Sequence, residues 1–202
     1  MISEKPILLK ASGVSGVLAP LVTFPCILLA VASSSSFSWT DNALSDLGVQ
    51  TGATAILFNS GLIIGGILGF MFSLGLFVHA SGSAVEKASV SVFALATLAL
   101  MAIGIFPENV RPNHYYASVA FFVLFPISML LMLFAMRSTR DLRSGLFMLI
   151  VGAVAAMPWV LYFSTHFVRG VAISELVSAF AASVWTIVRG CRMFKQASRL
   201  AN

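Results

Sequence analysis

Six long runs of apolar residues, separated by short polar stretches, dominate the pattern of the chain. Each run approaches or exceeds the roughly 18–20 residues that a helix needs to cross a bilayer. Backbone groups in lipid must be hydrogen-bonded within their own segment, so runs of this length predict helices rather than barrel strands of about 10 residues. The predicted spans are residues 7–32, 53–78, 88–106, 115–136, 145–163 and 171–188.

Composition supports the same fold class. Hydrophobic residues make up 59% of the 202 residues and charged residues 9%, against roughly 45–50% and 25% in soluble domains. So few charges cannot cover the surface of a soluble protein. Because the connections are short and no repeat is evident, the sequence predicts an all-α, polytopic integral membrane protein of the cell membrane. Its single domain, residues 1–202, is expected to hold six transmembrane helices in one bundle.

The first apolar run has a second interpretation as a signal peptide. Lys5 and Lys10 form a basic beginning, and Ala30-Val31-Ala32 resembles a cleavage site of small residues. However, the run is longer than the usual 7–15 apolar residues of a signal peptide, and it contains Pro20 and Pro25. We expect the helix to be retained. Cleavage would leave five spans in the same orientation.

The distribution of basic residues predicts the orientation of the spans. Ten of the 12 basic residues lie in the amino terminus, the second and fourth connections and the carboxyl tail, which places both termini in the cytoplasm. These ten are Lys5, Lys10, Lys87, Arg137, Arg140, Arg143, Arg189, Arg192, Lys195 and Arg199. The net charge of +5 does not indicate nucleic-acid binding, because no basic stripe is interleaved with aromatic residues.

Small residues and prolines predict how the helices pack. Gly61, Gly65 and Gly69 repeat at four-residue spacing in the second span, and small residues at that spacing let two helices approach closely. A substrate tunnel is the alternative interpretation of this row. Pro126 and Pro158 are expected to bend the fourth and fifth helices.

Residues capable of chemistry gather at the predicted outer ends of the spans. The first outer loop, residues 38–48, reads as a short capped turn, and the third outer loop carries acidic, basic and imidazole groups. The candidate ligand-binding residues are Asp46, Asn59, Glu108, Arg111, His114, His166, Arg169 and Glu175.

The motifs at these ends resemble one known family. They are Ser-Asp-Leu-Gly at 45–48, Phe-Asn-Ser-Gly-Leu at 58–62, Phe-Pro-Glu at 106–108 followed by His114, and Gly170 with Glu175. Together they resemble the prokaryotic multi-pass membrane family known as domain of unknown function 998. More distantly, they are similar to the eukaryotic six-span group that includes the damage-regulated autophagy modulators. The resemblance covers about residues 13–188 and implies a six-span fold with a polar site on the outer face, and no established reaction. Where the family's last motif has a second charged residue, this chain has Leu176.

Most candidates also have a purely structural interpretation. Asp46 can cap a helix, Asn59 can bridge two helices, and Glu108 can form a surface ion pair with Arg111 three residues later. His114 opens the fourth span, where an interfacial polar residue is common.

Glu175 and the residues of the fifth loop have other interpretations. An ionisable group inside a span usually faces a cavity or a partner, so we expect Glu175 to contact Arg169, Arg111 or His114. We further expect Glu175 and His114 to belong to one site. His166 and Arg169 have the alternative role of contacting lipid phosphate.

The sequence supports binding of a lipid headgroup or small ligand, or a structural role, as the first hypothesis. The second is a membrane-embedded hydrolase acting on a lipid, with His114, Glu175 and Asp46 as catalytic candidates. A triad of Ser45, His114 and Asp46 can be drawn, but spacing alone gives it little weight.

A metal-assisted form of that hydrolase is also open, because His114, His166 and Asp46 offer three potential zinc ligands without any paired-ligand spacing. We assign no metal and no cofactor. Solute transport is the third hypothesis, disfavoured because no charge lies near the middle of a span and no inverted repeat is evident. Membrane lipids are the expected partners, nucleic acid is not expected, and protein partners stay open.

Overall fold

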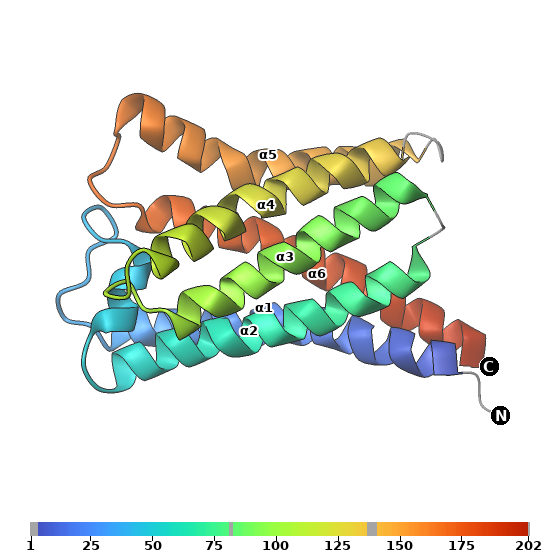
Figure 1. The fold of residues 1–202 in the computed structure, drawn as a ribbon, viewed down its shortest axis with the longest axis horizontal. Helices are drawn as coiled ribbons and strands as arrows, with labels where there is room; N and C mark the ends of the chain where they lie inside the picture. Colours follow the sequence, from blue (N-terminus) through green and yellow to red (C-terminus); the bar gives the residue numbers. More distant parts are fainter. Residues whose placement is uncertain (1–3, 81–82, 137–140, 202) are drawn as a thin grey trace.

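In a computed structural model, which describes residues 4–80, 83–136 and 141–201, six long α-helices lie side by side (Figure 1). Each of the six is long and apolar enough to cross a membrane. Their bounds are α1 Glu4–Ala32, α2 Ala53–His79, α3 Ala84–Ile105, α4 Asn113–Met136, α5 Leu142–Thr165 and α6 Ala172–Ala201. The prediction of an all-α fold with six candidate membrane spans is confirmed. Arg137 and Arg140, two of the predicted cytoplasmic residues, lie outside the described residues.

The helix ends agree with the predicted spans within about four residues, except at the end of the chain. α6 continues to Ala201, whereas the predicted span ends at residue 188. The predicted span ends at residue 188 because the uninterrupted run of apolar residues ends before Arg189 and Arg192. These charged residues lie on one side of a helix whose other side stays apolar. Met193 and Ala197 remain buried in this segment. The last helix is therefore a membrane span with an amphipathic extension.

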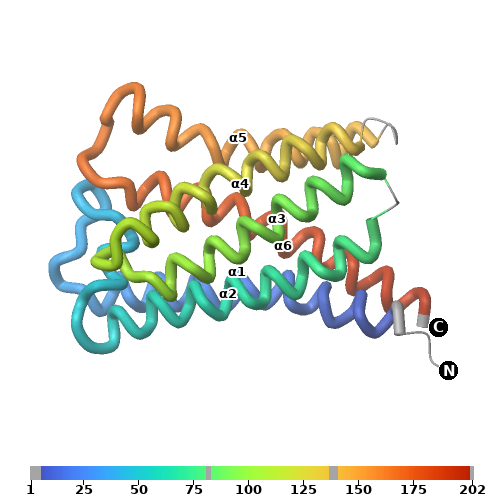
Figure 2. Tube along the Cα trace, in the orientation of Figure 1, coloured from blue at the N-terminus to red at the C-terminus, as the bar shows by residue number. Residues whose placement is uncertain are grey.

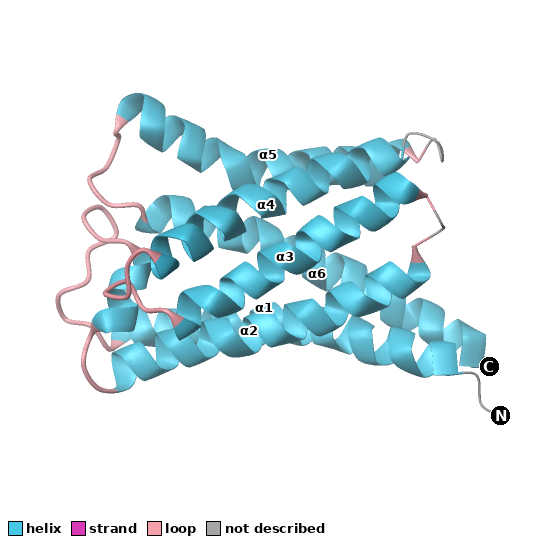
Figure 3. Cartoon of the chain, viewed as in Figure 1, coloured by secondary structure: helices cyan, strands magenta, loops and turns pink. Residues whose placement is uncertain are grey.

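The helices form a closed ring in chain order. Each helix packs mainly against its neighbours in the sequence, and α6 packs back against α1 (Figure 2). Both termini consequently lie at one end of the bundle, which we call the terminal end. The longer loops, 33–52, 106–112 and 166–171, lie at the opposite end, together with a short 3-10 helix, η1, Leu44–Val49 (Figure 3). We call this the loop end.

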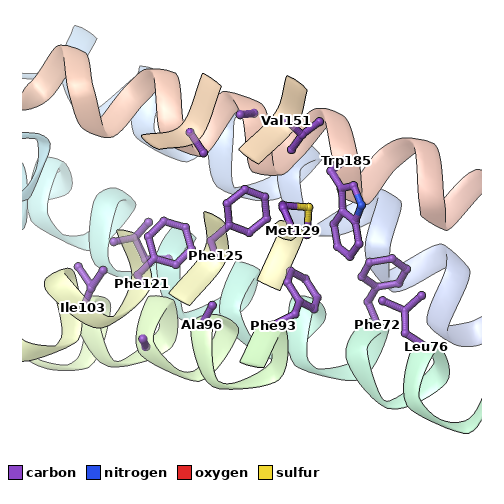
Figure 4. Packing of buried hydrophobic residues seen from close by; sticks show 14 of the residues in the cluster. Phe72, Leu76, Phe93, Ala96, Ile103, Phe121, Phe125, Met129, Val151 and Trp185 are labelled. Atoms are coloured by element: carbon purple, nitrogen blue, oxygen red, sulfur yellow. The ribbon is translucent and has the colours of Figure 1, made fainter. Parts of the chain in front are cut away.

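Aromatic side chains fill the centre of the ring. Trp185 of α6 is fully buried and makes edge-on contacts with Phe72, Phe93 and Phe125 from α2, α3 and α4 (Figure 4). Its indole N–H donates a hydrogen bond of 3.1 Å to the sulfur of Met148 on α5. Five helices thus converge on one apolar cluster, where such aromatic pairs stabilise the packing beyond their buried area.

Glycines bring α2 into close contact with both of its neighbours. A Cβ on Gly65 would collide with the Thr23 side chain of α1, and a Cβ on Gly66 would lie 2.7 Å from the backbone nitrogen of Met101 on α3. The Thr23 hydroxyl donates to the carbonyl of Gly61 at 3.2 Å. The prediction of close helix packing along the glycine row is therefore confirmed, and neighbouring side chains fill the space that a tunnel would need.

Candidate functional site

A groove of about 1030 Å³ lies between α4 and α5 toward the loop end. The two helices separate in this direction (Figure 1), and the space between them has predominantly apolar walls. The walls include Val119, Phe122, Val123, Ile127 and Leu130 of α4 with Ala156, Trp159, Val160, Tyr162 and Phe163 of α5. Polar groups reach the groove at its loop end, from Ser45, Glu108, Arg111, His114 and Glu175. We call this cavity the α4/α5 groove.

Glu175 contributes a buried carboxylate to the groove from the first turn of α6. The residue is only 8% exposed, and its Oε2 accepts a hydrogen bond of 2.6 Å from the backbone N–H of Leu44. The expected partners lie elsewhere: Arg169 pairs with Asp41, and Arg111 pairs with Glu108. The carboxylate thus satisfies the first N–H of η1 instead of pairing with a cation.

Two polar side chains hold η1 above the bundle. The Asp46 carboxylate accepts bonds from the backbone N–H of Ala43 at 3.0 Å and the amide of Asn42 at 2.8 Å. Asn59 of α2 donates to the carbonyl of Gly48 at 2.9 Å. Asp46 therefore caps a helix, as its structural interpretation proposed, and Asn59 joins α2 to η1 rather than lining the groove.

Glu108 connects the third loop to η1 and to the rim of the groove. Its carboxylate accepts a hydrogen bond from the Ser45 hydroxyl at 3.3 Å and forms an ion pair with Arg111 at 3.3 Å. Partial burial raises the pKa of Glu108, and the adjacent Asp46 carboxylate raises it further through a hydrogen bond and charge repulsion. His114 and Arg111 oppose this shift. The Glu108 and Asp46 carboxyl groups therefore lie next to each other.

His114 is held in a defined orientation at the start of α4. The side chain is 6% exposed, and its Nδ1 lies 2.7 Å from the carbonyl oxygen of Phe106. Because a carbonyl oxygen only accepts hydrogen bonds, Nδ1 carries the proton in this contact. In the neutral ring Nε2 is then an acceptor, and the Ser118 hydroxyl lies 3.3 Å from it. His114 and Ser118 both line the groove.

The triad drawn from the sequence is not formed. Ser45 donates to Glu108, the Asp46 carboxylate is held by Asn42 and Ala43, and His114 contacts Phe106 and Ser118. Glu175 and His114 both line the groove, yet each is anchored to a different backbone group. Within residues 4–80, 83–136 and 141–201, no set of three His, Cys, Asp or Glu side chains is arranged to hold a metal ion.

His166 and Arg169 lie outside the groove. His166 ends α5 in a left-handed conformation with φ 48° and is exposed. The Arg169 guanidinium is 90% exposed and pairs with Asp41 at 3.4 Å. Of the eight candidate residues, the groove therefore brings together Glu108, Arg111, His114 and Glu175, with Asp46 next to Glu108.

Backbone hydrogen bonds join the first and fifth loops. The N–H groups of Arg169 and Gly170 both donate to the carbonyl of Thr40, and the N–H of Ala172 donates to the carbonyl of Asn42, at 2.8–3.0 Å. A Cβ on Gly170 would collide with the backbone of Asn42, so only glycine permits this approach. We call the contact of residues 40–42 with residues 169–172 the loop junction.

Sequence reasoning missed the groove itself and the aromatic residues that line it. Trp159 donates a hydrogen bond to the Ser178 hydroxyl at 3.0 Å and packs on Phe122, with ring centroids 4.7 Å apart. Tyr162 donates to the carbonyl of Arg169 at 3.2 Å. Aromatic residues near span ends are ordinary features of a membrane interface, so their positions in the sequence carry no specific signal for a cavity.

Comparison with known proteins identifies a family and no characterised relative. The family model described as "Protein of unknown function (DUF998)" matches residues 17–192. No curated protein and no solved structure matches the chain.

Proposed function

Since the chain belongs to the DUF998 family, whose description names no function, we propose its role from the site alone: the protein binds a membrane lipid in the α4/α5 groove. The observation that carries this proposal is the combination of long apolar walls with a cluster of charged groups at one end. That distribution matches an amphipathic molecule with one hydrocarbon part and one polar part. At about 1030 Å³, the groove is at the upper end of the roughly 300–1,000 Å³ of small-molecule sites.

The location of the groove favours a lipid over a water-soluble ligand. Its walls belong to two candidate membrane spans. Several of the lining residues, including Val119, Val123, Val160 and Phe163, are also exposed on the outside of the bundle. An apolar surface of this kind is covered by hydrocarbon in a bilayer. A lipid can therefore enter sideways without leaving the membrane.

Filling the groove tests the proposal. Ala156→Trp places an indole between the groove walls, whereas Ala153→Trp places the same group at an exposed position of α5, nearer the terminal end, that does not line the groove. Native mass spectrometry after purification in mild detergent measures the lipid retained by each variant. We expect Ala156→Trp to reduce lipid occupancy several-fold and Ala153→Trp to leave it unchanged. Equal occupancy in the two variants would contradict binding in this groove.

One observation supports the alternative of a lipid hydrolase. His114 presents its unprotonated Nε2 beside the groove, where it can accept a proton from a water molecule attacking an ester carbonyl. The test is release of fatty acid from ester-linked phospholipids by the purified protein. Activity that is lost in His114→Gln and retained in Ser118→Ala would establish the enzyme, and lipid binding without any release would reject it. Solute transport gains no support from the bundle centre, where apolar side chains pack together.

We further propose that the terminal end of the bundle faces the cytoplasm and that the protein resides in the cell membrane. Its support is the excess of basic residues at that end, eight among the described residues against two at the loop end. Reporter fusions at Ser83 and after the last residue should report cytoplasm, and a fusion at Gln50 should report the exterior. The opposite pattern would overturn the orientation.

A further inference from the structure

Resting on the lipid-binding function proposed above, we infer that the α4/α5 groove selects phospholipids whose headgroup carries a primary ammonium group. The inference stands on the charge distribution around the polar end of the groove. Glu108 and Glu175 line it, and Asp46 lies next to Glu108 without lining the groove. Arg111 is the one lining residue with a permanent positive charge in the described part of the chain.

Glu175 is the strongest element of this site. It is a buried carboxylate that lines the groove, and among the described residues its one hydrogen bond comes from the N–H of Leu44 to Oε2. A neutral N–H donor compensates only part of the cost of burying a charged carboxylate. Its Oε1 is thus available to a cationic ligand, and the groove supplies the space for one.

Glu108 adds a second carboxylate from a different segment of the chain. Its Oε1 faces Arg111 and its Oε2 accepts from Ser45, both at the longer distance of 3.3 Å. The elevated pKa of this group reflects burial and the adjacent Asp46 carboxylate, which means that the surrounding protein groups only partly compensate its negative charge. A primary ammonium has three N–H donors, enough to bind Glu108 and Glu175 together.

Arg111 provides the complementary charge at the rim. Its side chain is 76% exposed, so the guanidinium can bind a phosphate group while staying in contact with water. In a phosphoethanolamine headgroup an anionic phosphate and a primary ammonium are separated by two carbon atoms. The arrangement of Arg111 next to the two glutamates matches that sequence of charges.

The same arrangement discriminates against other headgroups. A choline group carries the positive charge but has no N–H donor, so it adds no hydrogen bond to either carboxylate. A glycerol headgroup has no cation, and its phosphate meets a cluster in which carboxylates outnumber the guanidinium. Leaving a buried charged group unpaired costs more than the pair itself contributes, which is the physical basis of the selectivity.

Lipid exchange measured by native mass spectrometry tests the inference. The full-length protein in mild detergent is equilibrated with phosphatidylethanolamine, its N-methyl and N,N-dimethyl derivatives, phosphatidylcholine and phosphatidylglycerol, all with the same acyl chains. We expect phosphatidylethanolamine to be preferred about tenfold over phosphatidylcholine, since one charge-assisted hydrogen bond contributes roughly this factor. Occupancy should fall stepwise as each N–H is replaced by a methyl group.

Variants connect that preference to the named carboxylates. Glu175→Gln and Glu108→Gln should each reduce the preference for phosphatidylethanolamine several-fold while total lipid binding is retained. Asp41→Asn, an exposed carboxylate outside the groove, is the matched control and should have no effect. If Glu175→Gln does not fold, Glu108→Gln gives the same readout from the rim.

The possible failures are distinct. Phosphatidylcholine or phosphatidylglycerol binding as tightly as phosphatidylethanolamine, with occupancy still sensitive to Ala156→Trp, would overturn the headgroup inference and leave the lipid groove in place. Absence of binding for every lipid would overturn the proposed function itself. A preference that persists in both glutamine variants would place the recognition of the ammonium elsewhere.

Discussion

Helices α2 and α5 show two opposite ways of placing a span in the same bundle. Half of the most apolar window of α2 is buried inside the protein, against 22% of the corresponding window of α5. α2 is packed on both sides through glycines that touch α1 and α3. α5 instead carries bulky residues such as Trp159 and Phe163, and it separates from α4 toward the loop end (Figure 1).

The comparison teaches that this bundle separates stability from the candidate site. Close glycine contacts leave no volume for a ligand, and they gather on α2. The groove lies where bulky side chains hold two helices apart, and polar groups from two loops and from the first turns of α4 and α6 reach its end. Substitutions on α2 are therefore expected to change stability, and substitutions around the α4/α5 groove to change binding.

The largest effect on stability is expected from adding one methyl group where α2 touches α3 at Gly66. In Gly66→Ala the new Cβ would lie 2.6–2.8 Å from Met101 atoms that include its backbone, so the helices must move apart at a cost of about 1–3 kcal/mol. In Gly145→Ala on α5 the Cβ would meet only a methyl group of Leu133 at 3.4 Å. That variant should be neutral or gain up to about 1 kcal/mol from helix propensity. Thermal unfolding in detergent measures both, and equal shifts would contradict the comparison.

An effect on stability of no more than the same size is expected at the attachment of η1. Glu175→Ala removes the acceptor for the Leu44 N–H and leaves a buried donor unpaired, which costs about 1–3 kcal/mol. Glu175→Gln retains a carbonyl acceptor and should cost less. Hydrogen exchange at Leu44 should rise sharply in the alanine variant. Unchanged protection there would show that another group holds η1.

The dependence of lipid binding on pH should be a few-fold and should follow Glu108. Burial and the Asp46 carboxylate raise its pKa, so acidification neutralises Glu108 at a higher pH than an ordinary glutamate. The charged and titratable groups that face Glu108 here are Asp46, Arg111, His114 and Glu175. We expect binding of an ammonium lipid to weaken as pH falls through the raised pKa, and Glu108→Gln to flatten that part of the profile.

Glu108 should also affect how the stability of the protein without lipid depends on pH. Here acidification should stabilise the protein, whereas it should weaken lipid binding. Because the pKa of Glu108 is raised in the fold, the folded state holds this proton more tightly than the unfolded chain. Its contribution to stability is therefore present at low pH and is lost as pH rises through the raised value. Thermal unfolding of Glu108→Gln against pH, compared with the unsubstituted protein, isolates this contribution.

The smallest effect is expected at the exposed ion pair of Arg169 and Asp41. Both side chains are largely in solvent, and exposed pairs contribute little to stability. The hydrogen bonds that the Ser38 and Thr40 hydroxyls donate, which lower the pKa of Asp41, do not depend on the arginine. Arg169→Ala should leave thermal stability and lipid binding unchanged, and a clear loss of either would extend the site beyond the groove.

The fold could be predicted from the sequence because each apolar run has a single way to satisfy its backbone in a membrane. The end of α6 could not be predicted in this way, because charged residues on one side of an amphipathic helix lower the mean hydropathy although the helix continues. Of the eight candidate site residues, Glu108, Arg111, His114 and Glu175 line the groove and the other four do not, and whether the groove is a functional site stays a prediction.

The partners within the site were harder to predict. Glu175 was expected to meet a side-chain cation and instead binds the N–H of Leu44, because backbone donors are present at every residue and leave no mark in a sequence. The groove depends on how far α5 leans from α4, which is decided by side chains from both helices together. The sequence pattern of either helix alone therefore does not predict the angle between α4 and α5.

The loop junction makes distant segments behave as one mechanical unit. Its three hydrogen bonds attach the beginning of α6 and the connection from α5 to the segment that precedes η1, and Glu175 attaches η1 to α6 a second time. An outward swing of the loop end of α5 therefore pulls on the segment that holds Ser45 and Asp46. For the proposed lipid ligand, we therefore expect widening of the groove and loosening of the contacts at its polar end to be a single movement, so that the loop junction sets the rate of lipid exchange.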